Sequence, residues 1–292
     1  MGCIKKLLFR MKKAIATISY MTLSTTSTSA TWSPQTVTNT GAALTWDVSG
    51  DIAPTSQNVN DPTFDLSLNT GTVNMNVYDV GNLSVLYIYS LNLTILNVSN
   101  IIGLTTLYCL INSLTTLNLT NNINLIDLIC RDNQLTTLDV TQNIELTSIS
   151  CGSNPLTALD LTNNINLLYL VCNNNQLTTL NVNNNTQLIQ LICYSNLLTS
   201  LSVINHSSLT VLEFYDNQIP SIDLSTNINL KIVRVYYNNM TSTATDQIYI
   251  DLANGVGING NLEIRNNRTS ASDAARATLV SRGWTFNETY TT

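Results

Sequence analysis

The sequence predicts a mainly β solenoid, in which short structural repeats stack into one elongated array. Five cysteines recur at one fixed spacing, as Cys109, Cys130, Cys151, Cys172 and Cys193, and an asparagine follows each of them three positions later. A leucine opens each of eight successive 21-residue units, the first at Leu83. A unit of this length cannot bury its own apolar face, so its core forms only when neighbouring units stack. The 292 residues would suit one or two ordinary domains, but the period favours a single array.

Residues 1–30 have the layout of a secretory signal peptide, with a basic start, a moderately apolar run and a Ser/Thr tract that ends at Ala30. A start at Met11 would place two lysines directly before the apolar run. Polar residues such as Thr17 interrupt that run, so an uncleaved, disordered tail is the alternative. No later stretch approaches the roughly 18 apolar residues that a transmembrane helix needs.

Residues 31–82 are predicted to form an N-terminal β cap. Apolar and polar residues alternate at 44–48, 64–68 and 73–77, and Gly, Pro and Asn lie between these runs. Alternation with a period of two indicates short strands. A cap is needed here because the terminal repeat of a solenoid otherwise exposes its apolar face.

Residues 83–240 form the predicted repeat array, and the first full unit defines its pattern. That unit reads Leu104-x-x-Leu107-x-Cys109-x-x-Asn112-x-Leu114-x-x-Leu117-x-Leu119. The pattern resembles the leucine-rich repeat family, specifically its irregular 21-residue bacterial class. The resemblance implies a leucine-rich repeat solenoid of the α/β superhelix class, mainly β, whose sheet forms a concave binding face. A pentapeptide or hexapeptide β-helix is the alternative, and the single asparagine at one fixed slot argues against it.

Two columns of asparagine are predicted to satisfy backbone groups at the turns, because a side-chain amide offers both a donor and an acceptor. The first column, a structural ladder, contains Asn112, Asn133, Asn154, Asn175, Asn196, Asn217 and Asn238. The second contains Asn122, Asn143, Asn164, Asn185 and Asn227. His206 occupies the missing position of the second column, which favours a structural hydrogen bond over a role as a general base.

The five periodic cysteines are expected to be buried thiols. They share one inward slot, and neighbouring strands lie about 4.8 Å apart, whereas the Cβ atoms of a disulfide lie about 3.8 Å apart. A ladder of disulfides is therefore the less favoured alternative.

Residues 241–292 are predicted to form a helical C-terminal cap. Asp246 is a candidate cap for a helix that stops near Gly255, and a second helix is expected from Ser272 to Arg282, with Trp284 packed behind it. This ending resembles the closing caps of leucine-rich proteins of bacteria and phages.

The charge of the chain restricts its partners. Charged residues make up only 10% of the sequence, the net charge is −6 and the pI is about 4.6. Such a chain offers no basic stripe to a nucleic acid or to an anionic membrane surface.

The outward positions of the first strand vary between repeats and are the candidate ligand-binding residues. They include Tyr87, Tyr89, Tyr108, Asp127, Arg131, Tyr169, Tyr194, Glu213, Tyr215, Arg234, Tyr236 and Tyr237. Tyr194, Tyr215 and Tyr236 share one slot, so their rings should lie side by side as a flat, rigid, amphipathic platform. The alternative is that tyrosine merely suits exposed strands.

Catalysis and metal binding have little support in the sequence. It contains one histidine and none of the nucleophile elbows, phosphate loops or zinc motifs that carry chemistry. A calcium ladder of Asp139, Asp160 and Asp223 would supply one carboxylate per repeat, whereas calcium needs six or more oxygens.

We therefore expect a monomeric, non-catalytic protein, secreted or on the cell surface, that binds a protein or glycan without a cofactor or metal. The alternatives are a host-recognition or decoration protein of a phage virion, a purely structural module and, least supported, a glycan-active enzyme using surface carboxylates.

Overall fold

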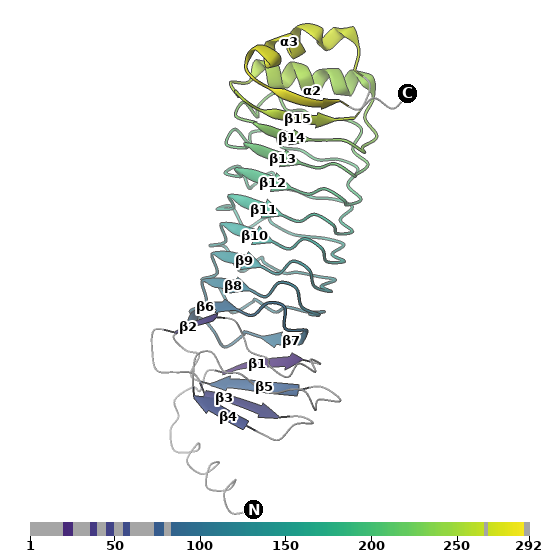
Figure 1. Ribbon diagram of the computed structural model, residues 1–292. Helices are drawn as coiled ribbons and strands as arrows, with labels where there is room; N and C mark the ends of the chain where they lie inside the picture. The colour runs from purple at the N-terminus through teal and green to yellow at the C-terminus, as the bar shows by residue number, and fades with distance from the viewer. Residues whose placement is uncertain are drawn as a thin grey trace, which may run out of the picture.

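The computed structural model describes residues 20–25, 36–39, 45–49, 55–58, 73–78, 83–265 and 268–288. The repeats stack into a long array, with a small sheet at its N-terminal end and helices at its C-terminal end (Figure 1).

An 11-stranded sheet runs along the array in the order β16-β15-β14-β13-β12-β11-β10-β9-β8-β6-β2. Its parallel strands are β6 Leu83–Tyr87, β8 Thr106–Tyr108, β9 Asp127–Ile129, β10 Ser148–Ser150, β11 Tyr169–Val171, β12 Gln190–Ile192, β13 Val211–Glu213, β14 Ile232–Arg234, β15 Asn261–Ile264 and β16 Thr285–Glu288. The register from β8 to β14 advances by one repeat per strand, so Thr106 pairs with Asp127. Equivalent residues of successive repeats therefore form columns along the sheet.

A second, five-stranded sheet lies at the N-terminal end, in the order β4-β3-β5-β1-β7. Its strands are β1 Tyr20–Thr25, β3 Thr45–Ser49, β4 Thr55–Asn58, β5 Val73–Tyr78 and β7 Leu93–Asn97, while β2 Thr36–Asn39 pairs antiparallel with β6. Strands β3 and β5 correspond to two of the three alternating runs in the sequence. The third run, at 64–68, lies outside the described residues, as does most of the predicted signal peptide. Strand β1 belongs to that predicted peptide and pairs with both β5 and β7.

The core of the array consists of columns of leucine and cysteine. The middle residue of each short strand points inward, and Leu107, Leu128 and Leu170 are fully buried. The five cysteines of residues 109–193 are also fully buried, and none of them forms a disulfide. Burial raises the pKa of the Cys109 thiol to about 12, because a thiolate would lose its hydration there.

The first asparagine column binds the backbone where the chain leaves each strand. In one repeat, the Asn133 side-chain amide donates to the carbonyl oxygens of Cys109 and Cys130 at 3.0 and 3.1 Å, and its Oδ1 accepts from Leu114 N at 3.0 Å. The preceding residue, Asp132, has a φ of 56°. This left-handed conformation turns the chain toward the second half of the repeat.

The second column acts at the other turn. Asn143 donates to the carbonyl oxygens of Leu119 and Asn122 at 3.1 and 2.8 Å. At the position of the missing asparagine, the buried His206 ring places Nε2 3.0 Å from the Val182 carbonyl oxygen and Nδ1 3.0 Å from that of Ile204.

The C-terminal end is covered by α2 Ser242–Asn254, the 3-10 turn η2 Ser270–Ser272 and α3 Asp273–Ser281. Trp284 is buried behind them, and its Nε1 donates to the Gly257 carbonyl oxygen at 2.9 Å. Gly260 is needed beneath this ring, since a Cβ there would lie 2.4 Å from Trp284.

The role predicted for Asp246 is wrong, because Thr241 caps α2 by accepting from Ala244 N. Asp246 is instead a buried residue within α2. Its carboxylate accepts from the Thr269 backbone N–H at 2.9 Å and from the hydroxyls of Thr269 and Ser272. It therefore joins α2 to the segment that precedes α3.

Candidate recognition surface

The solvent-facing side of the parallel sheet, here called the outer sheet face, carries three columns of side chains. The first and third residues of each short strand supply two columns, as Gln190 and Ile192 do in β12. The residue after the inward cysteine, such as Tyr194, supplies the third. Because the core does not use these positions, their chemistry is free to differ between repeats.

The third column contains a row of face-to-face rings, the tyrosine stack, formed by Tyr194, Tyr215 and Tyr236. The centroids of Tyr194 and Tyr215 lie 4.3 Å apart with the rings 8° from parallel, and those of Tyr215 and Tyr236 lie 4.4 Å apart at 15°. Neighbouring rings thus cover each other's faces. The stack presents ring edges and hydroxyls to a ligand, rather than the flat platform that the sequence led us to expect.

The pKa of the middle hydroxyl, on Tyr215, is raised by burial first and by its two neighbouring tyrosines second. This phenol therefore remains a neutral donor and acceptor at physiological pH.

An ion-pair chain lies beside the stack in the second column. Arg234 Nε donates to Glu263 at 2.8 Å, and Arg234 also pairs with Glu213 through its Nη1. The Glu213 and Glu263 side chains are only 11% and 22% exposed, so the paired charges are fixed against the sheet. Because two carboxylates share one guanidinium, the ion-pair chain carries one net negative charge.

A single arginine closes the C-terminal end of the stack. The Arg265 guanidinium lies 4.6 Å from the Tyr236 ring centroid and 5.1 Å from that of Tyr237, and it donates to the Tyr237 hydroxyl at 2.6 Å. Tyr237 meets Tyr236 edge-on and is 59% exposed. The positive guanidinium lies over the negative face of the last ring, which is the favourable geometry for a cation–π contact.

A second aromatic group lies at the N-terminal end of the outer sheet face. Tyr87 and Tyr108 stack with centroids 4.6 Å apart, and the Tyr108 hydroxyl donates to the Asp127 carboxylate. That hydrogen bond is the largest cause of the raised pKa of Tyr108, about 12. Four strand spacings, about 19 Å, separate this group from the tyrosine stack.

The remaining predicted residues are not brought into either group. Tyr169 lies between the groups on β11 and is 42% exposed. Arg131 pairs with its neighbour Asp132, and both side chains are exposed. Tyr89 is half-buried, near the N-terminal end of the face. On β10, in the middle of the sheet, the two outward residues, Ser148 and Ser150, are small.

The tyrosine stack, the ion-pair chain and Arg265 together form one cluster, the C-terminal group, and two of its residues, Glu263 and Arg265, were not predicted from the sequence. Both follow α2, and β15 pairs with β14 at a longer offset than the repeat, so that Arg234 lies beside Glu263. Shifting the alignment by this longer offset would have matched Glu263 with Arg234 and Arg265 with Tyr236.

A column of carboxylates lies on the strip formed by the second halves of the repeats, here called the opposite strip. These carboxylates bond to nearby backbone groups. The Asp139 and Asp160 carboxylates each accept from the backbone N–H two residues later at 2.9 Å. Hydrogen bonds from Thr141, through its hydroxyl first, hold the pKa of Asp139 below its usual value. Among the described residues, no three His, Cys, Asp or Glu side chains gather as a metal site, and no helix is long and apolar enough to cross a bilayer.

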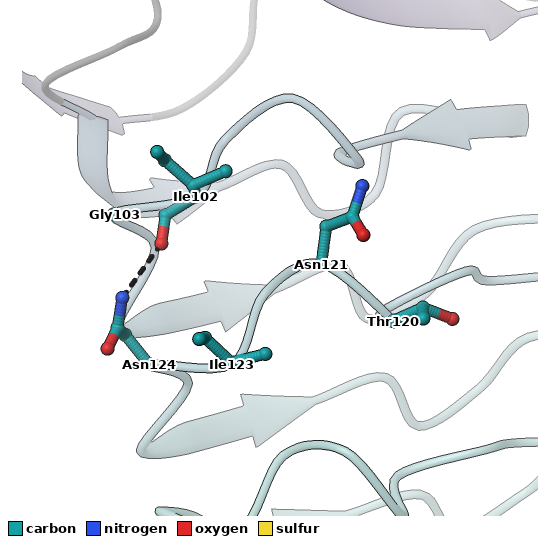
Figure 2. Close-up of a pocket in the computed structure, with 6 residues that line it drawn as sticks. All are labelled: Ile102, Gly103, Thr120, Asn121, Ile123 and Asn124. Carbon is teal, nitrogen blue, oxygen red and sulfur yellow. Dashed lines mark hydrogen bonds between the residues drawn. The ribbon is translucent and has the colours of Figure 1, made fainter.

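A shallow depression lies on the edge of the array where the repeats turn toward the strands (Figure 2). Ile102, Ile123 and the amide of Asn121 line it, and Asn124 Nδ2 donates to the Ile102 carbonyl oxygen at 2.9 Å. The isoleucines at this position in four successive repeats, 102, 123, 144 and 165, are half exposed or more. The lining residues carry no charge and no nucleophile other than a threonine hydroxyl, so this depression lacks the groups of a catalytic or ion-binding site.

Comparisons with known proteins agree with the repeat architecture. No protein-family model and no curated protein matches the sequence. Among solved structures, the functional domain of InlJ from Listeria monocytogenes, which includes a cysteine ladder, aligns with a TM-score of 0.61 and 29% identity over 76% of this chain and 50% of that one.

Two further structures share the fold at lower identity. A leucine-rich repeat protein of Leptospira interrogans gives a TM-score of 0.56 and 21% identity over 71% of this chain and 60% of that one. The leucine-rich repeat part of FLRT2, in an octameric complex with Latrophilin 3 and Unc5D, aligns with a TM-score of 0.55 and 19% identity over 71% of this chain and 70% of that one. The chain spans about half of the InlJ chain and three fifths of the Leptospira one.

Proposed function

We propose that this chain, which is a leucine-rich repeat protein, is a non-catalytic recognition protein that binds a protein partner on its outer sheet face. The observation that carries the proposal is the C-terminal group, in which the tyrosine stack, the ion-pair chain and Arg265 form one rigid, mixed polar and aromatic surface. Aromatic residues and arginine dominate the binding energy of protein interfaces. Because these side chains are already held by one another, binding would order few of them.

Protein is favoured over glycan as the partner by the orientation of the rings. A sugar stacks best on an open ring face, but neighbouring rings at 4.3 and 4.4 Å cover the faces within the stack, and Arg265 covers the end face of Tyr236, which leaves, among the described residues, one open face, on Tyr194. The hydroxyls and ring edges of these half-buried tyrosines suit the hydrogen-bonding groups of a polypeptide. The leucine-rich repeat part of FLRT2 occurs in a complex with other proteins, which is in keeping with this choice.

A secreted or surface location is part of the proposal and rests on the sequence pattern of residues 1–30. Cleavage after Ala30 would remove β1 from its place between β5 and β7. Sequencing the N-terminus of the protein from the culture medium distinguishes a cleaved signal peptide from an uncleaved N-terminal segment. A start at Thr31 supports the signal peptide, whereas a cell-retained chain that keeps residues 20–25 contradicts it.

The binding face is tested by replacing Tyr194, Tyr215 and Tyr236 with serine in the full chain. The control variant replaces three exposed threonines of the opposite strip, Thr157, Thr178 and Thr199, with alanine. Partners are captured from the proteins of the surrounding medium and cell surfaces by both variants and by the wild type. If the stack is a centre of binding energy, the tyrosine variant loses affinity by roughly 30-fold or more.

Both variants should keep the circular dichroism spectrum and melting temperature of the wild type. Equal binding by the two variants would move the site away from the stack. Unfolding of the tyrosine variant alone would assign the rings a structural role instead.

A further inference from the structure

The two ends of the tyrosine stack differ. At the C-terminal end, the Arg265 guanidinium lies over the Tyr236 ring at 4.6 Å. At the N-terminal end, the inner face of Tyr194 meets Tyr215, while among the described residues no aromatic ring or cation is in contact with its other face. One ring face of the stack is therefore left without the partner that the opposite end has.

The neighbour that precedes Tyr194 in its column does not fill this position. Asn173 occupies the third column in the preceding repeat, and its side chain leans away, over Gly152. A Cβ added to Gly152 would lie 2.6 Å from Asn173 Oδ1, so the glycine provides the space that Asn173 occupies. The side chain in the position equivalent to Arg265 is thus short, neutral and directed toward the previous strand.

The electrostatics of this position favour a cation. On the N-terminal side of Tyr194, the nearest cation in the same column is Arg131, three repeats away and already paired with Asp132. The Asp216 carboxylate, next to Tyr215, accepts from the hydroxyl of Ser195, the residue after Tyr194, at 2.7 Å and so places a negative charge near the stack. The whole chain has a net charge of −6. A ring face is itself negative, so its preferred partner is a guanidinium or ammonium group.

We propose that the uncovered face of Tyr194 is the docking position for an arginine side chain of the protein partner. The arginine would repeat at the N-terminal end of the stack the contact that Arg265 makes at the other end. Arginine is preferred over lysine because its planar guanidinium stacks on a ring and is less strongly hydrated. This inference rests on the proposed function and specifies the chemistry of the partner at one position of the outer sheet face.

The test measures binding of a fluorescein-labelled peptide of alternating glycine and arginine to the full chain at about 0.15 M salt, where long-range attraction is screened. Tyr194→Ser is compared with Thr178→Ala, which changes an exposed side chain of the opposite strip, away from the outer sheet face. A cation–π contact predicts a loss of affinity of about 2- to 30-fold for Tyr194→Ser and none for Thr178→Ala. The same peptide with lysine should bind more weakly to the wild type.

A second pair of variants leaves Tyr194 in place. Asn173→Arg puts a guanidinium of the chain itself beside the open ring face and should block the peptide. Thr199→Arg adds the same charge on the opposite strip and should leave binding near the wild-type value. If Tyr194→Ser does not fold, these two variants still test the proposal: equal peptide binding by Asn173→Arg and Thr199→Arg would refute it.

Equal affinity of Tyr194→Ser and Thr178→Ala, or no binding to the wild type at millimolar peptide, would overturn the inference. The proposed function has a separate outcome, since it fails only when the triple tyrosine variant still captures the partners of the wild type. Loss of those partners together with unchanged peptide binding by Tyr194→Ser would keep the recognition surface and reject the arginine position.

Discussion

Replacing Asn154 with alanine should destabilise the middle of the array, and the structure gives the size of the effect. Asn154 is 4% exposed. Its Nδ2 donates to the carbonyl oxygens of Cys130 and Cys151, both at 3.1 Å, and of Gly152 at 3.2 Å. Its Oδ1 accepts from Leu135 N at 2.9 Å.

These four contacts are not equivalent. Each of the three carbonyl oxygens has a second donor. The Cys130 oxygen accepts from Asn133 Nδ2 at 3.1 Å, that of Cys151 from Asn175 Nδ2 at 3.2 Å, and that of Gly152 from the Asp132 backbone N–H at 3.0 Å. The buried N–H of Leu135 has Asn154 as its one acceptor among the described residues. An orphaned buried N–H costs about 1 to 3 kcal/mol, and the weakened carbonyl contacts add roughly 1 kcal/mol. The free energy of unfolding should therefore fall by about 2 to 4 kcal/mol.

Urea denaturation measures this loss, and hydrogen exchange at the Leu135 amide locates it. The matched control is Asn163→Ala, because Asn163 is exposed and donates a single hydrogen bond, to the Thr141 carbonyl oxygen at 3.0 Å. That change should cost no more than about 0.5 kcal/mol. If the two variants lose the same stability, or if exchange at Leu135 is unchanged in Asn154→Ala, the ladder does not stabilise the turns as argued.

Three further predictions concern the thiols, the C-terminal cap and pH. The cysteines from Cys109 to Cys193 should resist thiol reagents until the protein unfolds, and fast labelling or disulfide-linked peptides from the native protein would contradict this. Trp284→Ala should lower stability by about 3 to 5 kcal/mol, with earlier hydrogen exchange in the last repeats, and an unchanged melting temperature would refute it. Burial raises the pKa of Asp251 in the folded state, so the stability linked to its protonated form is full below its unfolded pKa of about 3.9 and is lost as pH rises through the folded value. Asp251→Asn should therefore be increasingly stabilised relative to the wild type as pH rises from about 4 toward neutrality in urea titrations, and a gap independent of pH would exclude this linkage.

The array could be predicted from the sequence because its determinants are local and periodic. Each leucine or cysteine contacts its equivalents in the adjacent repeats, so one unit defines the environment of all the others. The burial of Leu107 and Cys109 follows from the same pattern as that of Leu170 and Cys172.

The parts that were missed depend on contacts between segments outside this period. Asp246 looked like a helix cap because it precedes an apolar run, but its partners Thr269 and Ser272 lie in the segment before α3. Glu263 and Arg265 join the candidate site only because the insertion of α2 lengthens the last repeat. Ring orientation was missed for another reason: strand spacing fixes how far apart the tyrosines lie, but not that their faces close on each other.

The residues that stabilise the array and those of the proposed recognition surface occupy different columns of the same repeat. Inward leucines and turn asparagines contact only the adjacent repeats. A substitution at one of these positions therefore disturbs the packing of the adjacent repeats and not of more distant ones. The chain already contains such a change at His206, which replaces the two cross-repeat contacts of asparagine with one to Val182 and one to Ile204. The repeats on both sides keep their register. Outward columns are still less constrained, since their side chains share no core atoms. An outward surface such as the tyrosine stack can therefore be assembled, or replaced, without altering the solenoid that supports it.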